Sequence, residues 1–228
     1  MRFQIGLLLF PRLTQLDLTG PYEVFIRCPD TDVHLVAKFL EPVVADGGMR
    51  LLPSTTFAEC PKLDLVCVPG GAGINPLLND PETLDFLRRQ ASDARYVTSV
   101  CTGALVLGAA GLLRGRRATT HWLSLPMLAA FGCEPEAERV VVDGNIITGG
   151  GVTAGIDFAL TVASELFGAD TAKRIQLWIE YAPHPPFDSG TPERADASVV
   201  QALRAAASAH QNERESAVGR AGARLANG

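Results

Sequence analysis

The sequence predicts a single α/β domain in which a parallel β-sheet is covered by helices on both faces. Short apolar runs of strand length alternate along the chain with longer segments of helical periodicity, a pattern typical of parallel sheets. At 228 residues the chain has the length expected of one α/β domain. Apolar residues make up 47% of the chain and charged residues 20%, which is enough apolar material for a large core.

The first half of the chain alternates strands with helices. Residues 3–10 (FQIGLLLF) form a continuous apolar run, as in a strand buried on both faces. One helix has clear start signals, with Asp80 as cap, Pro81 in the first position and Glu82 in the first turn. The expected elements are strands at 3–10, 32–39 and 63–71, an edge ribbon at 49–57, and helices at 16–27 and 80–94.

The second half continues the alternation. Residues 95–100 (RYVTSV) predict a buried strand, and the helix after it is expected to stop at Gly115. Asp-Gly-Asn at 143–145 joins two β-rich runs, which predicts a hairpin, and Pro126 interrupts one helical pattern. The further elements expected are a short strand at 117–120, the hairpin at 139–148, and helices at 102–115, 122–132, 149–168 and 169–181.

A Pro/Gly-rich segment, residues 182–194, separates this pattern from the C-terminal part of the chain. From Ala197 an Ala/Arg/Glu-rich helix is expected to run into a tail, residues 219–228, that frays. We therefore expect residues 1–195 to form the α/β domain and residues 196–228 to form a helix and tail packed on it.

Composition argues against several classes of protein. A net charge of −5 without a basic patch argues against nucleic-acid binding and against an anionic membrane surface. No run of 18 apolar residues is present, and the apolar run near the N-terminus is too short for a signal peptide. The five cysteines include no C-x-x-C pair, so we expect no disulfide framework, no metal site and a cytoplasmic protein with reduced thiols. Four of these cysteines are expected to be buried and inert: Cys28, Cys60, Cys67 and Cys133.

Cys101 differs from the other four in its position. It lies where the strand at 95–100 ends and the next helix begins, at the sheet edge where parallel folds bind ligands. The small flanking residues Ser99 and Gly103 meet the steric requirement of a nucleophile elbow. The positive end of the following helix is expected to lower the pKa of the thiol. Cys101 is therefore predicted to be a nucleophile.

A glycine pair ends the neighbouring strand at the same sheet edge. The backbone amides of Gly70 and Gly71, together with that of Thr102, are candidates for binding developing negative charge. The alternative is that the two glycines only form a turn, and the residues favour neither interpretation.

Five segments together resemble the DJ-1/PfpI superfamily. The resemblance extends over roughly residues 3–190 and is strongest to the isocyanide hydratase branch. It implies a flavodoxin-like, parallel-sheet sandwich of the DJ-1/PfpI type with a nucleophile elbow. The segments are LDLTGPYEVF, CVPGG, VTSVCTGALVLGAAGLLRGRRATTHW, DGNIITGGGVTAGIDFAL and RIQLWIEYAP.

The resemblance assigns a role to Asp17. In this superfamily an acidic side chain after the first strand reaches the cysteine sulfur, and Asp17 is the matching residue here. Residue type alone would favour a helix cap at this position. Thr102 stands where protease-like relatives have histidine, so peptidase activity is not expected. Its hydroxyl is expected to position water or the substrate nitrogen, unless its role is purely structural at the helix start.

Three more residues are expected near the substrate. His121 matches a histidine found near the cysteine in many superfamily members, and it is either a packing residue or a proton carrier. Gly150 and Val152 are expected to line the pocket with their backbone. The alternative for this segment is a glycine-rich strand-to-helix turn with no direct role.

The resemblance implies a hydro-lyase that adds water to a small-molecule isocyanide through a covalent thioimidate on Cys101. It implies no metal or organic cofactor, and a homodimer. Two alternatives stay open: a glyoxalase or deglycase of the same superfamily, and a cysteine-based redox or ligand sensor.

Overall fold

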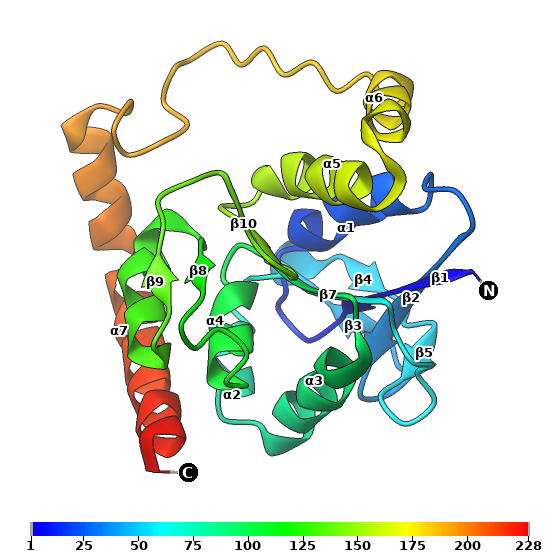
Figure 1. Cartoon of the computed structure of the whole chain (residues 1–228). Coiled ribbons are helices and arrows are strands. Elements are labelled where there is room, and N and C mark those ends of the chain that lie inside the picture. The colour runs from blue at the N-terminus through cyan, green and yellow to red at the C-terminus, as the bar shows by residue number, and fades with distance from the viewer. Residues whose placement is uncertain (1, 228) are drawn as a thin grey trace.

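The computed structural model describes residues 2–227 and confirms the α/β fold (Figure 1). Its central sheet has seven strands in the order β10-β11-β7-β6-β1-β2-β5, and every neighbouring pair is parallel except β10 with β11. The five inner strands follow the flavodoxin-like order, as expected. The strands are β1 (Phe3–Leu8), β2 (Thr31–Ala37), β5 (Thr55–Thr56), β6 (Leu65–Val68), β7 (Tyr96–Val100), β10 (Val140–Asp143) and β11 (Ile146–Gly149).

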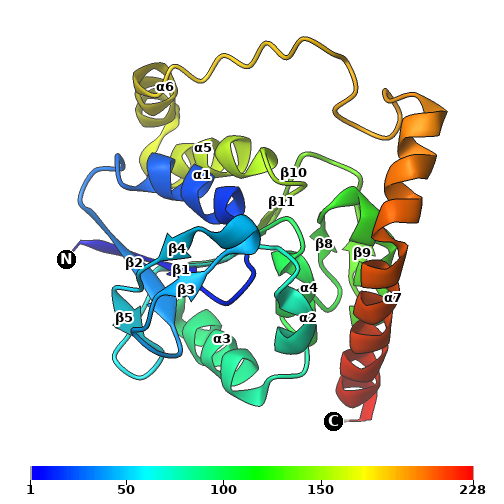
Figure 2. The same ribbon diagram turned by 180° about the vertical axis from the view of Figure 1, so that it is seen from behind.

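Helices cover both faces of this sheet (Figures 1 and 2). On one face α1 (Gln15–Phe25) packs against α5 (Ala154–Phe167), and α6 (Ala169–Trp178) packs on α5. The other face carries α2 (Ile74–Leu77), α3 (Pro81–Asp93) and α4 (Gly103–Ala109). The long helix α7 (Ala197–Asn227) packs on α2, α4 and the 3₁₀ segment η2 (Trp122–Phe131). The remaining elements are β3 (Val43–Val44), η1 (Asp46–Gly48), β4 (Arg50–Leu51), β8 (Arg117–Ala118) and β9 (Glu134–Pro135).

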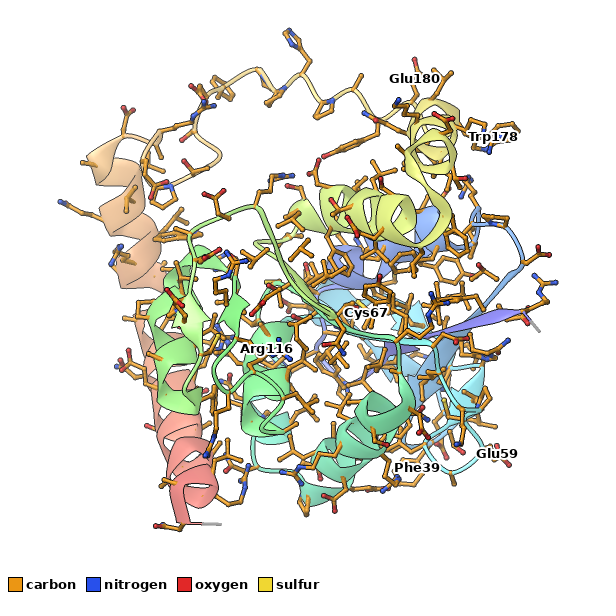
Figure 3. All side chains as sticks on the ribbon, viewed as in Figure 1. Phe39, Glu59, Cys67, Arg116, Trp178 and Glu180 are labelled. Atoms are coloured by element: carbon orange, nitrogen blue, oxygen red, sulfur yellow. The ribbon has the colours of Figure 1, made fainter. Side chains whose placement is uncertain are left out.

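The central strands form the core because both of their faces are covered. All four residues of β6 are buried, and Cys67 lies within this strand near the centre of Figure 3. The hairpin β10–β11 forms as expected, with Gly144 at a φ of 62° in its turn. Asp80 accepts a hydrogen bond from the backbone N–H of Thr83, as the cap of α3 should. No helix within residues 2–227 is long and apolar enough to cross a membrane.

The helix after β7 is shorter than the sequence predicts. α4 ends at Ala109, and Gly111 with a φ of 81° follows it. The N–H of Gly111 donates to the Gly108 carbonyl, and that of Leu112 donates to the Leu107 carbonyl. This is a Schellman ending, so Gly111 and not Gly115 stops the helix.

Two further expectations were wrong. Residues 122–131 form 3₁₀ turns around Pro126 where a helix interrupted at Pro126 was expected, and proline, which has no N–H, cannot donate within an α-helical ladder. The C-terminal tail stays helical to Asn227 because its side chains are anchored on the body. Val218 and Ala221 are buried, and Arg224 donates to the side chain of Asn79.

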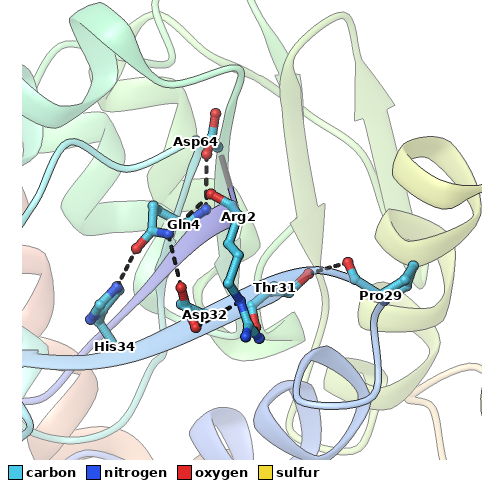
Figure 4. A network of polar contacts seen from close by, with 7 residues as sticks. All are labelled: Arg2, Gln4, Pro29, Thr31, Asp32, His34 and Asp64. Atoms are coloured by element: carbon cyan, nitrogen blue, oxygen red, sulfur yellow. Dashed lines mark hydrogen bonds and ion pairs between the residues drawn. The ribbon is translucent and has the colours of Figure 1, made fainter.

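A polar network closes the amino edge of the sheet, opposite the carboxyl ends of the strands (Figure 4). Gln4 on β1 donates its Nε2 to Asp32 at 3.2 Å, and its Oε1 lies 2.7 Å from Nε2 of His34. Arg2 forms an ion pair with Asp32 at 3.0 Å, and Asp64 accepts from the Gln4 backbone N–H. These contacts bind β1 to its two neighbours at the far edge from Cys101.

Candidate active site

The site lies where four adjacent parallel strands end. β1 leads to α1 with Asp17, and β6 leads to the turn with Gly70. β7 leads directly to Cys101, and β11 leads to Gly150. These strands are neighbours in the order β11-β7-β6-β1, so their carboxyl ends bring these residues together.

Cys101 has the backbone of a nucleophile elbow. Its φ is 55°, in the left-handed region that non-glycine residues rarely adopt. Its N–H donates to the carbonyls of Gly149 and Gly150, and its own carbonyl accepts from Thr120 Oγ1 at 2.7 Å. A Cβ at position 103 would lie 2.0 Å from the Val68 carbonyl oxygen, so the elbow requires glycine there. The predicted backbone geometry is confirmed.

Asp17 lies beside the cysteine and is fully buried. It occupies the first turn of α1, whose cap residue is Thr14, so Asp17 is not the helix cap. Its Oδ2 accepts from the Gly70 N–H at 3.1 Å, whereas Oδ1 is buried without a hydrogen-bond partner among residues 2–227. Burial raises the pKa of Asp17 to about 7, although the Cys101 side chain and the Gly70 N–H lower it.

The Cys101 thiol is also buried, with 4% of its surface exposed. Burial and the neighbouring Asp17 carboxylate raise its pKa above the ordinary value, against the opposing effect of the Thr102 and Val152 amides. The Thr102 amide at the helix start does lower this pKa, but burial and Asp17 raise it more, so the net direction is opposite to the prediction. The two groups therefore hold one proton between them above about pH 7, and a second proton binds as the pH falls below 7.

The Gly70–Gly71 turn holds the other two side chains of the site. The Gly71 N–H donates to Thr102 Oγ1 at 3.0 Å, and the Gly70 N–H donates to Asp17. A Cβ at position 70 would lie 2.5 Å from the Thr102 nitrogen and 2.9 Å from Asp17 Oδ2. Both amides are thus engaged within the protein, where they orient Asp17 and Thr102 and are not available to a substrate anion.

Backbone from the β11–α5 turn completes the surroundings of Cys101. The Val152 amide interacts with the thiol, and the Gly150 N–H donates to the Arg139 carbonyl. His121 caps η2, since its Nδ1 accepts from the Leu123 N–H at 3.3 Å. Burial and then Arg214 lower the pKa of His121, which favours its neutral form. The structure thus gives His121 a capping role.

Sequence reasoning missed two residues, Thr120 and Arg214. Thr120 supports the Cys101 carbonyl, and nothing in its local pattern marks it. Arg214 reaches the site from α7, 113 positions beyond Cys101, and its Nη2 donates to the Gly71 carbonyl at 3.4 Å. Within residues 2–227 no group of three or more His, Cys, Asp or Glu side chains is placed to hold a metal ion.

Comparison with known proteins assigns the family. The model of the DJ-1/PfpI family matches residues 4–165. The chain belongs to this family. Within the DJ-1/PfpI family, the chain is 59% identical over 225 residues to isonitrile hydratase from Pseudomonas putida, and the match covers 99% of both chains.

Solved structures of DJ-1/PfpI proteins show the same fold. A ThiJ/PfpI family protein from Pseudomonas syringae superposes with a TM-score of 0.94 at 41% identity, covering 96% of this chain and 91% of the other. DJ-1beta from Drosophila melanogaster superposes with a TM-score of 0.74 at 26% identity, covering 80% of this chain and all of the other. The longer coverage of the first match extends the likeness into the C-terminal part of the chain.

Proposed function

We propose that this chain is an isonitrile hydratase, which adds water to an isocyanide to give an N-substituted formamide. One observation carries the proposal: the 59% identity to the Pseudomonas putida isonitrile hydratase extends over 99% of both chains. The buried pair of Cys101 and Asp17 supports it, because hydration of an isocyanide needs one nucleophile and one proton carrier.

The first half of the reaction forms a covalent adduct. As the Cys101 sulfur attacks the terminal carbon of R–N≡C, the thiol proton moves to Asp17. The new carbon–sulfur bond leaves a lone pair on that carbon, and Asp17 returns the proton to it. The product is a thioimidate, Cys101–S–CH=N–R, and Asp17 is again a carboxylate. A pKa of about 7 for Asp17 suits both proton transfers near neutral pH.

The second half releases the product. The Asp17 carboxylate takes a proton from water as the hydroxyl adds to the thioimidate carbon, and it passes this proton to the nitrogen. The tetrahedral species then breaks its carbon–sulfur bond as Asp17 moves the hydroxyl proton to the departing sulfur. This yields R–NH–CHO, restores the Cys101 thiol and leaves Asp17 as a carboxylate. The leaving group is the enzyme's own sulfur, so no histidine is needed to protonate an amine.

Thr102 and Val152 have supporting roles in this proposal. Their amides interact with the Cys101 sulfur and stabilise its anionic form. The Thr102 hydroxyl is held by Gly71 beside the carboxylate, from where it orients the attacking water or the substrate nitrogen.

Turnover assays test the proposal. The protein is incubated with an alkyl or aryl isocyanide, and formation of the formamide is followed for the wild type, Cys101→Ala and Asp17→Ala. We expect turnover by the wild type, none by Cys101→Ala and nearly none by Asp17→Ala. A parallel assay with methylglyoxal tests for glyoxalase activity. Turnover of methylglyoxal but not of isocyanides would contradict the proposal.

We further propose a cytoplasmic homodimer. All five cysteines are free, as in a reducing compartment. Leu177, Trp178 and Phe187 are each more than three-quarters exposed, and residues 182–191 arch away from the body between α6 and α7 (Figures 1 and 3). A second copy that covers these side chains would remove this apolar surface from water. Light scattering should give twice the chain mass of 24.2 kDa, and Trp178→Glu should lower it.

A further inference from the structure

Arg214 is a buried charge at the boundary between α7 and the active site. Its side chain is 4% exposed, although arginine is among the residues least often buried. Its Nε donates to Asn75 Oδ1 and its Nη1 to Ser124 Oγ, each at 3.0 Å. Its Nη2 donates to the Gly71 carbonyl at 3.4 Å and lies 2.8 Å from Nε2 of His210. The guanidinium is therefore held firmly in one position.

All of these partners are uncharged. Asn75, Ser124 and Gly71 offer neutral oxygens, and His210 accepts through a neutral ring nitrogen. No carboxylate within residues 2–227 forms an ion pair with Arg214, whereas Arg117, Arg139 and other exposed arginines do have acidic partners. A guanidinium stays protonated even when buried, and burying an unpaired charge costs several kcal/mol. This cost implies that the charge has a use.

The charge of Arg214 is linked to the active-site cysteine. The Gly71 carbonyl accepts from Arg214 and from the Thr102 hydroxyl, so Arg214 is separated from the residue after Cys101 by one carbonyl group. The two charges also interact: burial lowers the pKa of Arg214, and a charged Cys101 raises it. A fixed cation near a dry site stabilises negative charge that forms there.

We propose that Arg214 is a positioning residue whose guanidinium stabilises negative charge on the Cys101 sulfur, so that α7 forms part of the active site. The inference rests on the proposed role of Cys101 as the nucleophile. Arg214 acts through the field of its charge and through its hold on Gly71, and it need not touch the substrate.

The titratable groups around the pair come from several elements. Asp17 from α1 raises the pKa of Cys101, and a charged Cys101 raises the pKa of Arg214 from α7, which shows that the Arg214 and Cys101 charges attract each other. His121 from η2 and His210 from α7 lie beside Arg214, and burial together with Arg214 lowers the pKa of both. Both histidines are thus favoured in their neutral forms, which leaves Arg214 as the charged member of this group, and its charge interacts with that of Cys101.

Alkylation of Cys101 by iodoacetamide tests the charge without using the isocyanide reaction. Its rate between pH 6 and pH 10 reports the thiolate fraction and is resolved for the Cys101 peptide by mass spectrometry. Arg214→Gln retains a hydrogen-bonding side chain but removes the charge, and should slow alkylation at pH 8 by about tenfold. Arg214→Lys retains the charge and should stay within about threefold of the wild type.

Arg224→Gln is the matched control. Arg224 also lies on α7 and also donates only to neutral groups, the Asn79 side chain and the carbonyls of Leu78 and Ala109. Its loss also removes three hydrogen bonds that dock α7 on the body, but it should leave the alkylation profile unchanged. Equal alkylation profiles for Arg214→Gln and the wild type overturn the inference. So does an Arg224→Gln variant that slows alkylation as much as Arg214→Gln does. An effect on alkylation in a protein that does not hydrate isocyanides would leave the inference standing and contradict only the proposed function.

Discussion

The backbone N–H of Gly70 holds Oδ2 of Asp17 at 3.1 Å, while the other carboxyl oxygen of Asp17 is buried without a hydrogen-bond partner in the described chain. One hydrogen bond does not compensate a buried carboxylate for its lost hydration, and this raises the pKa of Asp17 to about 7. The fold thus keeps an acid beside Cys101 that can both give and take a proton at neutral pH.

Asp17 should cost stability as the pH rises. Its pKa is about 7 in the folded chain against an ordinary value of 3.8, so the folded state binds the proton more tightly and loses stability between pH 4 and pH 7. Asp17→Asn is neutral throughout. Its free energy of unfolding relative to the wild type should therefore increase by about 3 kcal/mol between pH 5 and pH 8, as measured in urea.

Asp188→Asn is the control for this comparison, because Asp188 is exposed and lies far from the site in the 182–191 segment. Its free energy of unfolding relative to the wild type should be the same at pH 5 and at pH 8. If Asp17→Asn shows no more gain at pH 8 than at pH 5, the pKa assigned to Asp17 is wrong.

Turnover should rise with pH through about 7. The reactive form of the pair holds one proton, and acid adds a second proton that blocks transfer from sulfur to Asp17. With a pKa of about 7, kcat/KM at pH 5 should be about a hundredfold lower than at pH 8. The rate of formamide formation is measured after subtraction of the acid-catalysed reaction without protein. A maximum near pH 5 would exclude this account of the pair.

Gly70→Ala should disrupt the turn that holds Asp17 and Thr102. The added methyl group would lie 2.5 Å from the Thr102 nitrogen and 2.7 Å from its Oγ1, so Thr102 and Asp17 must both move. We expect kcat to fall by about a hundredfold, since small displacements of catalytic groups have effects of that size.

Gly219→Ala is the matched control for Gly70→Ala. Nothing lies within 4 Å of a Cβ at position 219, which is exposed on α7. This variant should keep full activity and gain about 0.5–1 kcal/mol of stability from helix propensity. Full activity of Gly70→Ala would show that the turn is not needed to orient Thr102 and Asp17.

Thr120→Val should weaken the elbow. The Thr120 hydroxyl donates to the Cys101 carbonyl at 2.7 Å, and its removal leaves this buried carbonyl with only the long 3.5 Å hydrogen bond from the Ala104 N–H, at a residue with a φ of 55°. We expect a loss of about 1–3 kcal/mol in stability and a fall in kcat.

Thr98→Val removes an equivalent buried hydrogen bond, from Thr98 Oγ1 to the Val66 carbonyl at 2.9 Å, in the middle of the sheet. It should cost similar stability but preserve kcat per folded molecule. If both variants keep kcat, the bond to Cys101 is structural and has no part in positioning the sulfur.

Local sequence patterns predict most of the order of strands and helices in this fold. Continuous apolar runs predicted β1 and β6 because a strand covered on both faces needs no polar residues, and a β-branched run predicted β7. The small flanks of Cys101 predicted the elbow, since Gly103 lies against the Val68 carbonyl. Helix ends were less predictable: Gly111 and Gly115 both have positive φ, and only the hydrogen bonds show which one ends α4.

The chemistry of the site depends on contacts between distant segments, which a local pattern does not contain. Asp17 was paired with Cys101 through resemblance, while its residue type alone favoured a cap. The pKa of Cys101 was predicted in the wrong direction because burial is a property of the folded molecule.

Arg214 did leave a signal in the sequence. It lies in the register of the buried face of α7, with Ala217, Val218 and Ala221 at spacings of three, four and seven. A charged residue in such a stripe indicates a buried polar contact. The pattern gives no partner, however, because Gly71, Asn75 and Ser124 are all distant from Arg214 in the sequence.

The central claim is that water is added to an isocyanide through a bond to Cys101, and time-resolved mass spectrometry tests it most directly. The wild type is mixed with an isocyanide, quenched at successive times and digested. We expect the Cys101 peptide to gain the full mass of the isocyanide transiently, and the adduct to disappear as formamide accumulates. Formamide produced by the wild type with no adduct at any time, or produced by Cys101→Ala, would contradict the claim.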